Sequence, residues 1–327
     1  MDHRLEELKT WINQSTSLSA ESIIPASADA SFRRYFRLSH ENNTYIVMDA
    51  PPDKESVSQF IKLSEVLSSI HVHAPEVIEK NSDQGFLLLE DLGDRPFLNE
   101  LERDAENLYA SAIDALIRIQ QGNKLKPDVV LPSYDRDKLL QEMNLFPTWY
   151  LKKHHQQSMT EDEENIWDKT TELLIEACLD QPQVWVHRDY HSRNLMITDS
   201  NSPGVIDFQD MVVGPICYDL VSLYKDCYIE WPREKQIDWL QHYLSKLSKG
   251  DPELKISFDQ LLKWYDLTGL QRHLKVLGIF CRLNYRDTKP QYLADLPLVE
   301  KYVHEVLNIY PELSDFKAFF DRIALVR

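Results

Sequence analysis

The sequence predicts an α+β chain with two lobes, a small sheet-rich lobe followed by a larger helical lobe. Three observations predict this fold class. Short strand-like runs with one intervening helical segment fill the first ninety or so residues. From about residue 97, apolar residues spaced three and four apart indicate a series of helices. A compact strand–loop–strand stretch at 184–208 interrupts that series. We place the lobe boundary between residues 91 and 92, which gives lobes of 1–91 and 92–327.

The first lobe is predicted to hold most of the sheet. An amphipathic helix is expected over 3–14, where Leu8, Trp11 and Ile12 share one face. Strands are expected at 22–27, 32–39 and 44–50, and the last ends before Pro51 and Pro52, which cannot continue it. A helix is expected at 54–70, and two further strands at 76–80 and 85–91.

The second lobe is predicted to be mostly helical. Its helices are expected at 98–121, 135–155, 161–179, 216–229, 234–248, 258–286, 295–309 and 314–324. Between the third and fourth of these, a short buried strand is expected at 184–186. A hairpin formed by 195–198 and 204–208 follows it.

Composition limits the possible partners. The 327 residues carry a formal net charge of −17, and no Lys/Arg block is present, so a nucleic-acid partner is not expected. No apolar run approaches the length of a membrane span. The four cysteines lack CxxC spacing, which favours reduced thiols. We therefore expect a cytoplasmic monomer with no membrane partner.

Glycine positions exclude the two commonest nucleotide-binding motifs near the N-terminus. All eight glycines lie at residue 85 or later. Neither GxxxxGK[ST] nor GxGxxG can therefore occur in the first lobe. If the chain binds ATP, it does so without a P-loop or a dinucleotide fingerprint.

The stretch 184–210 contains the residues with the clearest chemical pattern. His187 and Asp189 follow a short strand, Asn194 comes five residues after Asp189, and Asp207 comes thirteen residues after Asn194. Phosphoryl transfer needs a carboxylate beside the attacking hydroxyl and oxygen ligands that hold Mg²⁺ against a triphosphate. The pattern H-x-D-x-x-x-x-N … I-D-F supplies these groups and is typical of a kinase catalytic loop.

The segment HRDYHSRNLMI resembles the HGDLHxxNxL signature of the aminoglycoside-phosphotransferase-like superfamily, and IDFQD resembles its IDxxD segment. The resemblance implies a bilobal protein-kinase-like fold in which the first lobe binds ATP. It implies that Asp189 is the catalytic base and that Asn194 and Asp207 hold Mg²⁺.

The same resemblance implies supporting roles for three other residues. Asp219 would be the structural carboxylate that braces the loop, and His187 would support the loop from its start. Asp210 would match the second acid of the metal-binding segment, with a less defined role.

Longer segments resemble one branch of that superfamily. DASFRRYFRL, GFLLLEDLGD and IDFQDMVVGPICYDLVSLYKDCYIEWP are similar to the bacterial anomeric kinases of N-acetylmuramate and N-acetylglucosamine. The similarity extends from about residue 22 to 303. It implies phosphorylation of the C1 hydroxyl of an N-acetyl amino sugar during cell-wall recycling in Gram-negative bacteria.

Two positions depart from the kinase pattern. Met48 stands where a strand lysine would contact the phosphates, and an ungapped alignment places Phe60 where its glutamate partner would stand. Loss of both is coherent, since a lone buried glutamate is costly. We therefore expect Arg33 or Arg34 to contact the nucleotide phosphates instead. The alternative is that both arginines are ordinary surface residues of a strand.

The resemblance also suggests binding residues. The segment LLLEDLG (87–93) resembles the hinge between lobes, where backbone groups of Glu90 and Leu92 would read the adenine edge. Glu142 and Trp149 lie in the segment that usually forms the substrate wall, and an aromatic ring there could stack on a sugar. A lactyl carboxylate could pair with Arg193, or with one of Arg272, His273, Arg282 and Arg286.

Two alternatives remain open at the level of the sequence. The substrate could be another small alcohol, such as an aminoglycoside, choline, homoserine or a methylthio-sugar, and the negative charge would suit a cationic one. The second alternative is a non-catalytic nucleotide-binding pseudokinase, motivated by Met48. Retention of Asp189, Asn194 and Asp207 argues against it.

Overall fold

The protein is represented by a computed structural model that describes residues 2–28 and 33–324. The chain divides into two compact units. The first unit comprises Met1–Ile119 and Arg193–Asp210, and the second comprises Gln120–Ser192 and Met211–Arg327. The lobe boundary expected at 91/92 therefore lies inside the first unit.

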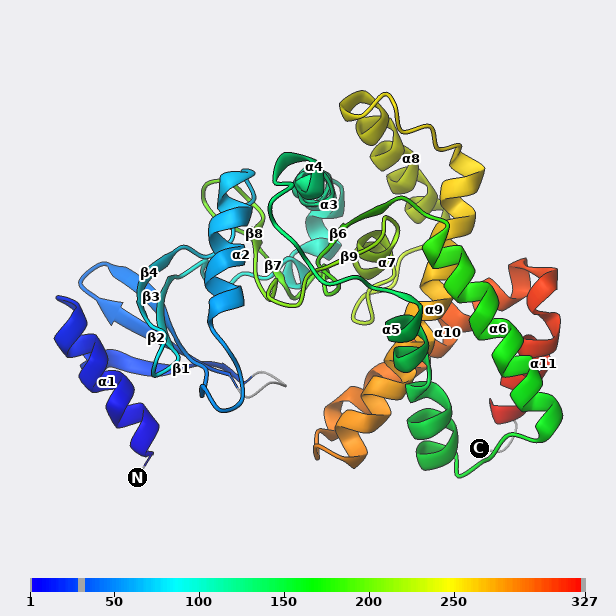
Figure 1. Ribbon diagram of the computed structural model, residues 1–327, viewed down its shortest axis with the longest axis horizontal. Coiled ribbons are helices and arrows are strands. Elements are labelled where there is room, and N and C mark those ends of the chain that lie inside the picture. Colours follow the sequence, from blue (N-terminus) through cyan, green and yellow to red (C-terminus); the bar gives the residue numbers. More distant parts are fainter. Residues whose placement is uncertain (1, 29–32, 325–327) are drawn as a thin grey trace. The chain divides into compact units, whose positions relative to one another are not determined.

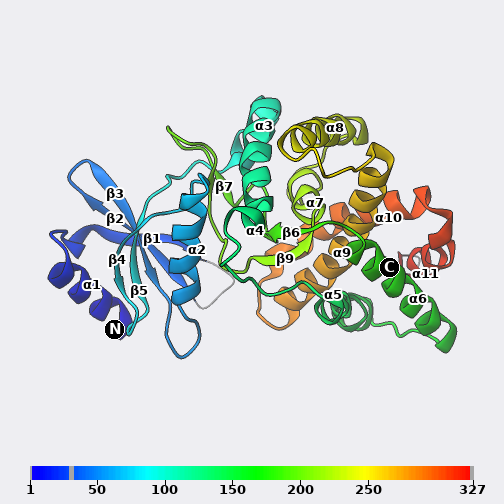
Figure 2. The same cartoon turned by 45° about the horizontal axis from the view of Figure 1, so that its top comes forward.

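The first unit is built on a five-stranded antiparallel sheet of order β1-β2-β3-β5-β4. Figures 1 and 2 show α1 and α2 on opposite sides of this sheet. The elements of this part of the chain are α1 (His3–Ser15), η1 (Ala20–Ser22), β1 (Ile23–Ala28), β2 (Arg34–His40), β3 (Asn43–Asp49), α2 (Ser58–Ser69), β4 (Val77–Asn81), β5 (Phe86–Glu90), η2 (Phe97–Asn99) and α3 (Leu101–Gln120).

Helix α1 forms because its apolar residues recur at helical spacing and because Asp2 caps its first turn by accepting from the Leu5 N–H. Its buried face packs on alternate residues of β2, β3 and β5, which point to the same side of the sheet. This apolar cluster contains Leu8, Trp11, Ile12, Ala20, Phe36, Leu38, Val47, Phe86 and Leu88.

The hairpin of β7 (Leu195–Met196) and β8 (Gly204–Val205) belongs to the first unit although it follows the stretch Gln120–Ser192 of the second. Hydrogen bonds explain this placement. The Val205 N–H donates to the His73 carbonyl at 2.7 Å, and the Ile197 N–H donates to the Arg95 carbonyl at 2.8 Å. The chain therefore returns to the first unit at the segment predicted to hold the metal ligands.

The second unit is mostly helical. The long helix α9 packs against α6, α7, α10 and η3, and all of its residues from Trp264 to Gly278 are buried. The elements of the second unit are α4 (Gly122–Leu125), α5 (Arg136–Met143), η3 (Phe146–His154), α6 (Glu161–Leu179), β6 (Gln183–Val186), β9 (Val212–Pro215), α7 (Tyr218–Tyr224), α8 (Arg233–Gly250), α9 (Phe258–Tyr285), η4 (Pro290–Asp295), α10 (Leu296–Ile309), η5 (Pro311–Leu313) and α11 (Ser314–Ala324).

One glycine in α9 is required by a close approach. A Cβ atom at Gly278 would lie 2.4 Å from the backbone carbonyl carbon of Leu145, so no larger residue fits without movement of the main chain. This contact lets α9 pack closely on the start of η3.

The predicted α+β fold is confirmed, and the local differences have physical causes. The single helix expected at 135–155 is two helices, α5 and the π-helix η3, and Pro147, which has no N–H to donate, lies at the start of η3. The strand expected at 204–208 stops at Val205, and Asp207 has φ +65°, a value outside the strand region. Strand β9, which pairs antiparallel with β6, was not predicted.

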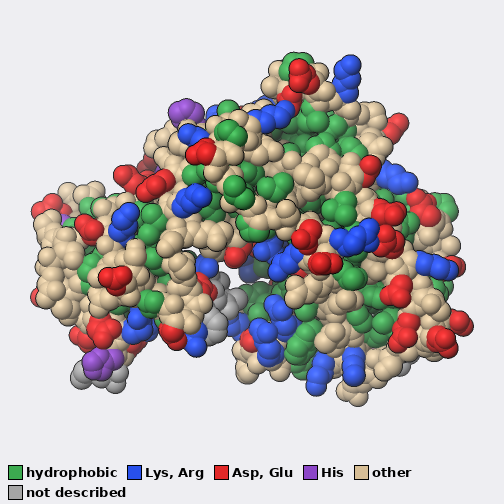
Figure 3. All heavy atoms as spheres, viewed as in Figure 1, with side chains coloured by type: hydrophobic (Ala, Val, Ile, Leu, Met, Phe, Trp, Pro, Cys, Tyr) green, Lys and Arg blue, Asp and Glu red, His purple; other side chains and the backbone are tan. Residues whose placement is uncertain are grey.

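Acidic side chains are scattered over the face of the molecule seen in Figure 3, with basic side chains between them. Among the helices of residues 2–28 and 33–324, none combines the length and apolar character that crossing a bilayer requires.

Candidate active site

The predicted catalytic loop begins directly after β6 and is braced by a buried carboxylate. The two oxygens of Asp219 accept the N–H groups of His187 at 2.7 Å and Arg188 at 2.9 Å. Burial raises the pKa of Asp219 to about 7, although the two N–H donors oppose this shift. Asp219 lies where the resemblance implies a bracing residue, and His187 is fully buried beside it.

A second carboxylate, which the sequence analysis did not identify, holds the other end of the loop. Asp226 accepts a hydrogen bond from the Ser192 N–H at 3.0 Å and another from the Ser192 hydroxyl. Asp226 is itself buried. The segment from His187 to Ser192 is therefore fixed at both ends by acids from the chain around α7.

Asp189 lies between these two braces with a partly exposed side chain, at 45% relative exposure. Arg272 is one cation that faces it, and its Nη2 lies 3.9 Å from Asp189 Oδ1. Burial raises the pKa of Asp189, but the positive charges of Lys275, His191 and Arg272 outweigh burial and lower the pKa to about 2. The carboxylate is therefore ionised throughout the neutral range.

Glu142, expected at the substrate wall, lies in an internal ion network. Its Oε1 accepts from Arg188 Nη2 at 2.6 Å, and its Oε2 is 2.9 Å from Lys275 Nζ. The Tyr134 hydroxyl also donates to Oε2. Burial raises the pKa of Glu142, but the positive charges of Lys275 and Arg188 have the larger opposite effect. The pKa of Glu142 therefore lies below its ordinary value. Neither Lys275 nor Tyr134 was singled out from the sequence.

The predicted metal ligands of the first unit lie side by side. Asn194 Nδ2 is 3.4 Å from Asp207 Oδ2, and the Ile206 N–H donates to the Asn194 carbonyl at 3.1 Å. Gln209 Nε2 donates to the other oxygen of Asp207 at 2.6 Å. Both side chains are partly exposed.

These residues fit a magnesium ion. Mg²⁺ is usually held by one or two protein oxygen ligands together with substrate phosphates and water. A turn of the Asn194 amide would present its oxygen beside Asp207 Oδ2. Among residues 2–28 and 33–324 there is no group of three or more His, Cys, Asp or Glu side chains that could hold a metal by itself. The pair therefore suits a cation shared with a nucleotide.

The two arginines expected at the phosphates have different surroundings. Arg34 is held by Asp49, which its Nε reaches at 2.9 Å, and by Asp2. Arg33 forms an ion pair with Glu55, and the charge of Asp210 in the metal segment also acts on it.

The interior of the first unit is apolar where a kinase would carry its lysine and glutamate. Met48 is 1% exposed and pairs with Leu87 in the sheet. Phe60 packs against Phe208, with ring centroids 4.7 Å apart. Phe208 directly follows Asp207, so this ring contact holds the segment that carries Asp207 against α2.

The predicted hinge is fixed by an arginine of β2. Arg37 binds Asp91 through two hydrogen bonds, of 2.6 and 3.0 Å, and also donates to the Gly93 carbonyl. Glu90 ends β5 and contacts His73 at 3.0 Å. Leu92 is buried, and its side chain lies against the position of Gly204.

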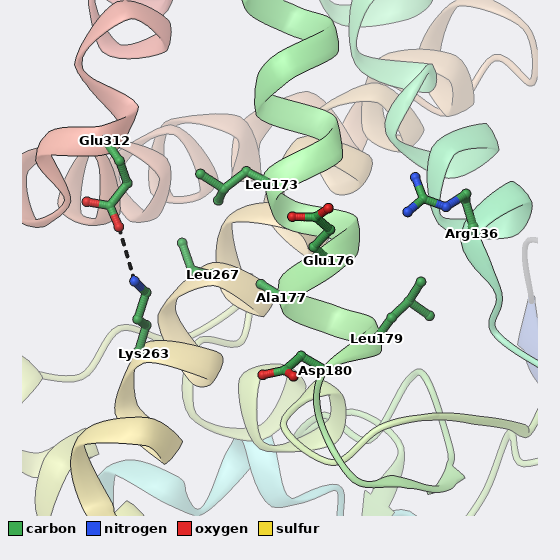
Figure 4. A pocket seen from close by; sticks show the side chains of 9 residues that line it. All are labelled: Arg136, Leu173, Glu176, Ala177, Leu179, Asp180, Lys263, Leu267 and Glu312. Carbon is green, nitrogen blue, oxygen red and sulfur yellow. Dashed lines mark hydrogen bonds and ion pairs between the residues drawn. The ribbon is translucent and has the colours of Figure 1, made fainter.

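The remaining predicted sugar contacts lie in different units. Trp149 is half-buried in η3 and packs against the apolar cluster of the second unit, whereas Arg193 is exposed at the start of the returning segment. A separate hollow of about 590 Å³ lies between α6 and α9, near the Lys263–Glu312 ion pair (Figure 4). None of the predicted site residues lines it.

Comparison with curated proteins finds relatives along nearly the whole chain. An N-acetylmuramate/N-acetylglucosamine kinase of Pseudomonas putida is 40% identical over 325 residues, covering 96% of this chain and 95% of the relative. A protein of the same name from Neisseria meningitidis is 39% identical, covering 95% and 93% of the two chains.

Solved structures share the fold at low sequence identity. A choline kinase of Streptococcus pneumoniae has a TM-score of 0.63 at 11% identity, covering 93% of this chain and all of its own. An ADP-bound aminoglycoside phosphotransferase has a TM-score of 0.59 at 16% identity, covering 94% and 99%. The model of the phosphotransferase enzyme family matches residues 22–255. The resemblance noted in the catalytic loop is thereby confirmed, and the chain belongs to the phosphotransferase enzyme family.

Proposed function

We propose that this protein transfers the terminal phosphoryl group of ATP to the C1 hydroxyl of N-acetylmuramate or N-acetylglucosamine. The observation that carries the proposal is 40% identity over nearly the full length of both chains to kinases named for these sugars. The charged Asp189 supports it, and so does the pair formed by Asn194 and Asp207, because these are the groups that phosphoryl transfer needs.

In the proposed mechanism Asp189 accepts a hydrogen bond from the C1 hydroxyl and orients its oxygen toward the γ-phosphorus. As the new oxygen–phosphorus bond forms, the bond to the leaving ADP oxygen breaks, and the hydroxyl proton passes to Asp189 and then to solvent. A pKa near 2 makes Asp189 a weak base, so orientation is its main contribution. Bound Mg²⁺ would neutralise phosphate charge, and Asn194 and Asp207 would hold it.

Binding roles follow from the surroundings of each residue. We assign the phosphate contact to Arg33, because the charge of Asp210, close to the predicted metal ligand Asp207, acts on its guanidinium. Arg34, in contrast, forms ion pairs with two carboxylates, those of Asp2 and Asp49. The backbone at Glu90 and Leu92 would read the adenine edge. Trp149 and Arg193 would contact the sugar and its lactyl carboxylate.

We also propose that the protein acts in the cytoplasm, where ATP is available, in the recycling of cell-wall amino sugars. A monomer would suffice for it, because both predicted metal ligands and the catalytic aspartate come from one chain.

The test is a parallel assay of ATP consumption with five acceptors: N-acetylmuramate, N-acetylglucosamine, kanamycin, choline and homoserine. We expect turnover with the two amino sugars, and phosphorus NMR should show a sugar 1-phosphate. Faster turnover with kanamycin, choline or homoserine, or a phosphate on C6, would contradict the substrate assignment. Absence of turnover with every acceptor, despite ATP binding, would indicate a non-catalytic nucleotide binder.

Two variants accompany the assay. Replacing Asp189 by Asn removes the base and should lower kcat by about 10²–10⁴-fold while the KM for ATP changes little. Asp168→Asn alters an exposed acid on α6 and serves as the matched control. Equal rates in the two variants would rule out Asp189 as the base.

A further inference from the structure

Arg188, which directly precedes Asp189, has an unfavourable main-chain conformation. Its φ is +78°, in the left-handed region that non-glycine residues rarely adopt. The signature that this loop resembles, HGDLHxxNxL, has glycine at this position, and glycine adopts such a φ without steric cost. The arginine side chain must therefore contribute something that offsets the strain.

Hydrogen bonds fix Arg188 from three directions. Its N–H donates to Asp219 at 2.9 Å, its carbonyl accepts from the Ser222 hydroxyl at 3.2 Å, and its guanidinium donates to Glu142 at 2.6 Å. The guanidinium also lies 5.6 Å from the centre of the Tyr134 ring. Strained residues persist only where the surroundings determine their conformation in this way, and they cluster at functional sites.

The partner of Arg188 is itself held firmly. Glu142 accepts from Lys275, and Lys275 also donates to the Tyr218 hydroxyl at 3.0 Å. The side chains of Arg188, Glu142 and Lys275 are 17%, 10% and 8% exposed. This network joins α5, α7 and α9 to the residue that precedes Asp189. One turn before Lys275, Arg272 faces Asp189 at 3.9 Å.

Stability alone is a weak reason for such a network. Ion pairs withdrawn from water commonly stabilise a fold no more than apolar residues of similar size, because their desolvation is costly. Alignment of the neighbouring Asp189 carboxylate is a stronger reason. A rotation about the Arg188 main chain would redirect the carboxylate of the next residue, and a misplacement of about 1 Å at a reacting group can cost 10²-fold in rate.

We propose that Arg188, held by Glu142 and Lys275, is a positioning residue that fixes the direction of the Asp189 carboxylate. Glu142 acquires the same role, in place of the sugar contact expected from the sequence. The inference rests on the proposed function only in taking Asp189 as the base, and it does not depend on which acceptor is phosphorylated.

The decisive variant is Arg188→Gly, because glycine relieves the main-chain strain while it removes the guanidinium. We expect a melting temperature close to that of the wild type, a fall in kcat of about 10²-fold, and a KM for ATP within about threefold. Thr288→Gly is the matched control, since Thr288 is exposed, also has a left-handed φ of +57°, and lies in the same unit. It should keep the wild-type kcat.

Two further measurements separate positioning from a general structural effect. Free guanidinium ion at low millimolar concentration should partly restore kcat in Arg188→Gly and leave Thr288→Gly unchanged. Glu142→Gln, which keeps the size of the side chain, should lower kcat as well. The double variant should lose little more than the worse single variant, because the two residues act as one unit.

The assay uses whichever acceptor the wild type phosphorylates, so failure of the amino-sugar proposal would appear in the wild type and failure of this inference only in the variants. A wild-type kcat in Arg188→Gly would overturn the inference. So would a fall in kcat of the double variant equal to the product of the two single-variant falls, because that would show that the two residues act independently. If Arg188→Gly does not fold, Glu142→Gln decides, and an unchanged kcat there would reject the proposal.

Discussion

At the scale of single residues, two left-handed main-chain positions coincide with the predicted chemistry. Arg188 has φ +78° and precedes the predicted base, whereas Asp207 has φ +65° and is itself a predicted metal ligand. Phe208, which follows Asp207, is fully buried, and Asp219 accepts the N–H groups of His187 and of Arg188 itself. In each case packing and hydrogen bonds compel a conformation that a free chain would avoid.

The lowered pKa of Asp189 leads to a pH prediction. A folded-state pKa of about 2 lies below the ordinary value of about 3.9, so the fold favours the ionised carboxylate. That contribution to stability is fully present above the ordinary pKa and is lost as pH falls toward 2. Protonation of Asp189 should therefore cause no loss of kcat/KM between pH 8 and pH 5.

The check is a pH–rate profile of the wild type and of Lys275→Met. Removing the positive charge of Lys275, the largest of the effects that lower the pKa of Asp189, should move any acid limb that belongs to Asp189 upward. Suppose instead that kcat/KM of the wild type falls below about pH 6, and that this fall moves to higher pH in Lys275→Met. That result would show that the pKa of Asp189 is not low.

At the scale of secondary-structure elements, the first unit has apolar residues at the two positions that the sequence analysis aligned with the lysine–glutamate pair of kinases. Met48 on β3 and Phe60 on α2 are both buried. An ion pair exists nearby, between Arg33 before β2 and Glu55 before α2. The charged pair thus lies in the loops that flank these elements, and its two side chains are largely buried.

Arg33 and Arg34 should respond differently to substitution. Arg33→Ala should raise the KM for ATP about tenfold or more, because a charge-assisted hydrogen bond to phosphate contributes about 1.5–3 kcal/mol. Arg34→Ala should instead lower the melting temperature, because Arg34 joins β2 to Asp49 and to Asp2 at the start of α1. Steady-state kinetics and thermal unfolding of both variants provide the measurement, and an unchanged KM in Arg33→Ala would contradict the assignment.

At the scale of the whole molecule, each of the two units is built from two separate segments of the chain. The predicted catalytic loop from His187 to Ser192 belongs to the second unit, and the segment Arg193–Asp210, which holds the predicted metal ligands, belongs to the first. Each unit has its own apolar cluster, which accounts for the separate compactness of the two parts. The predicted base and the predicted metal ligands are therefore supported by different cores.

Nucleotide binding should stabilise the protein only when magnesium is present. A ligand present at a concentration of about 100 times its Kd adds about 2.7 kcal/mol to the free energy of unfolding. A non-hydrolysable ATP analogue with Mg²⁺ should therefore raise the melting temperature by a few degrees. Chelation of Mg²⁺, or Asp207→Ala, should remove most of this increase. Asp199→Ala is the control, since Asp199 is fully exposed on the same hairpin. An equal increase in Asp207→Ala would exclude Asp207 as a metal ligand.

The sequence by itself determined the fold class and most helix and strand positions, and it singled out the candidate residues of the catalytic loop, because periodicity and motif spacing are local properties of the chain. It did not indicate β9, the π-helix η3, the Asp226 brace or the Glu142–Arg188–Lys275 network.

Only the tertiary structure decided these features, because each depends on which distant segments meet. Lys275 lies 133 positions from Glu142 along the chain, and no local pattern links them. The return of residues 193–210 to the first unit is likewise decided by hydrogen bonds to His73 and Arg95, more than one hundred positions earlier. Local sequence specifies which groups are present, whereas packing decides which of them are buried together and which charges they share.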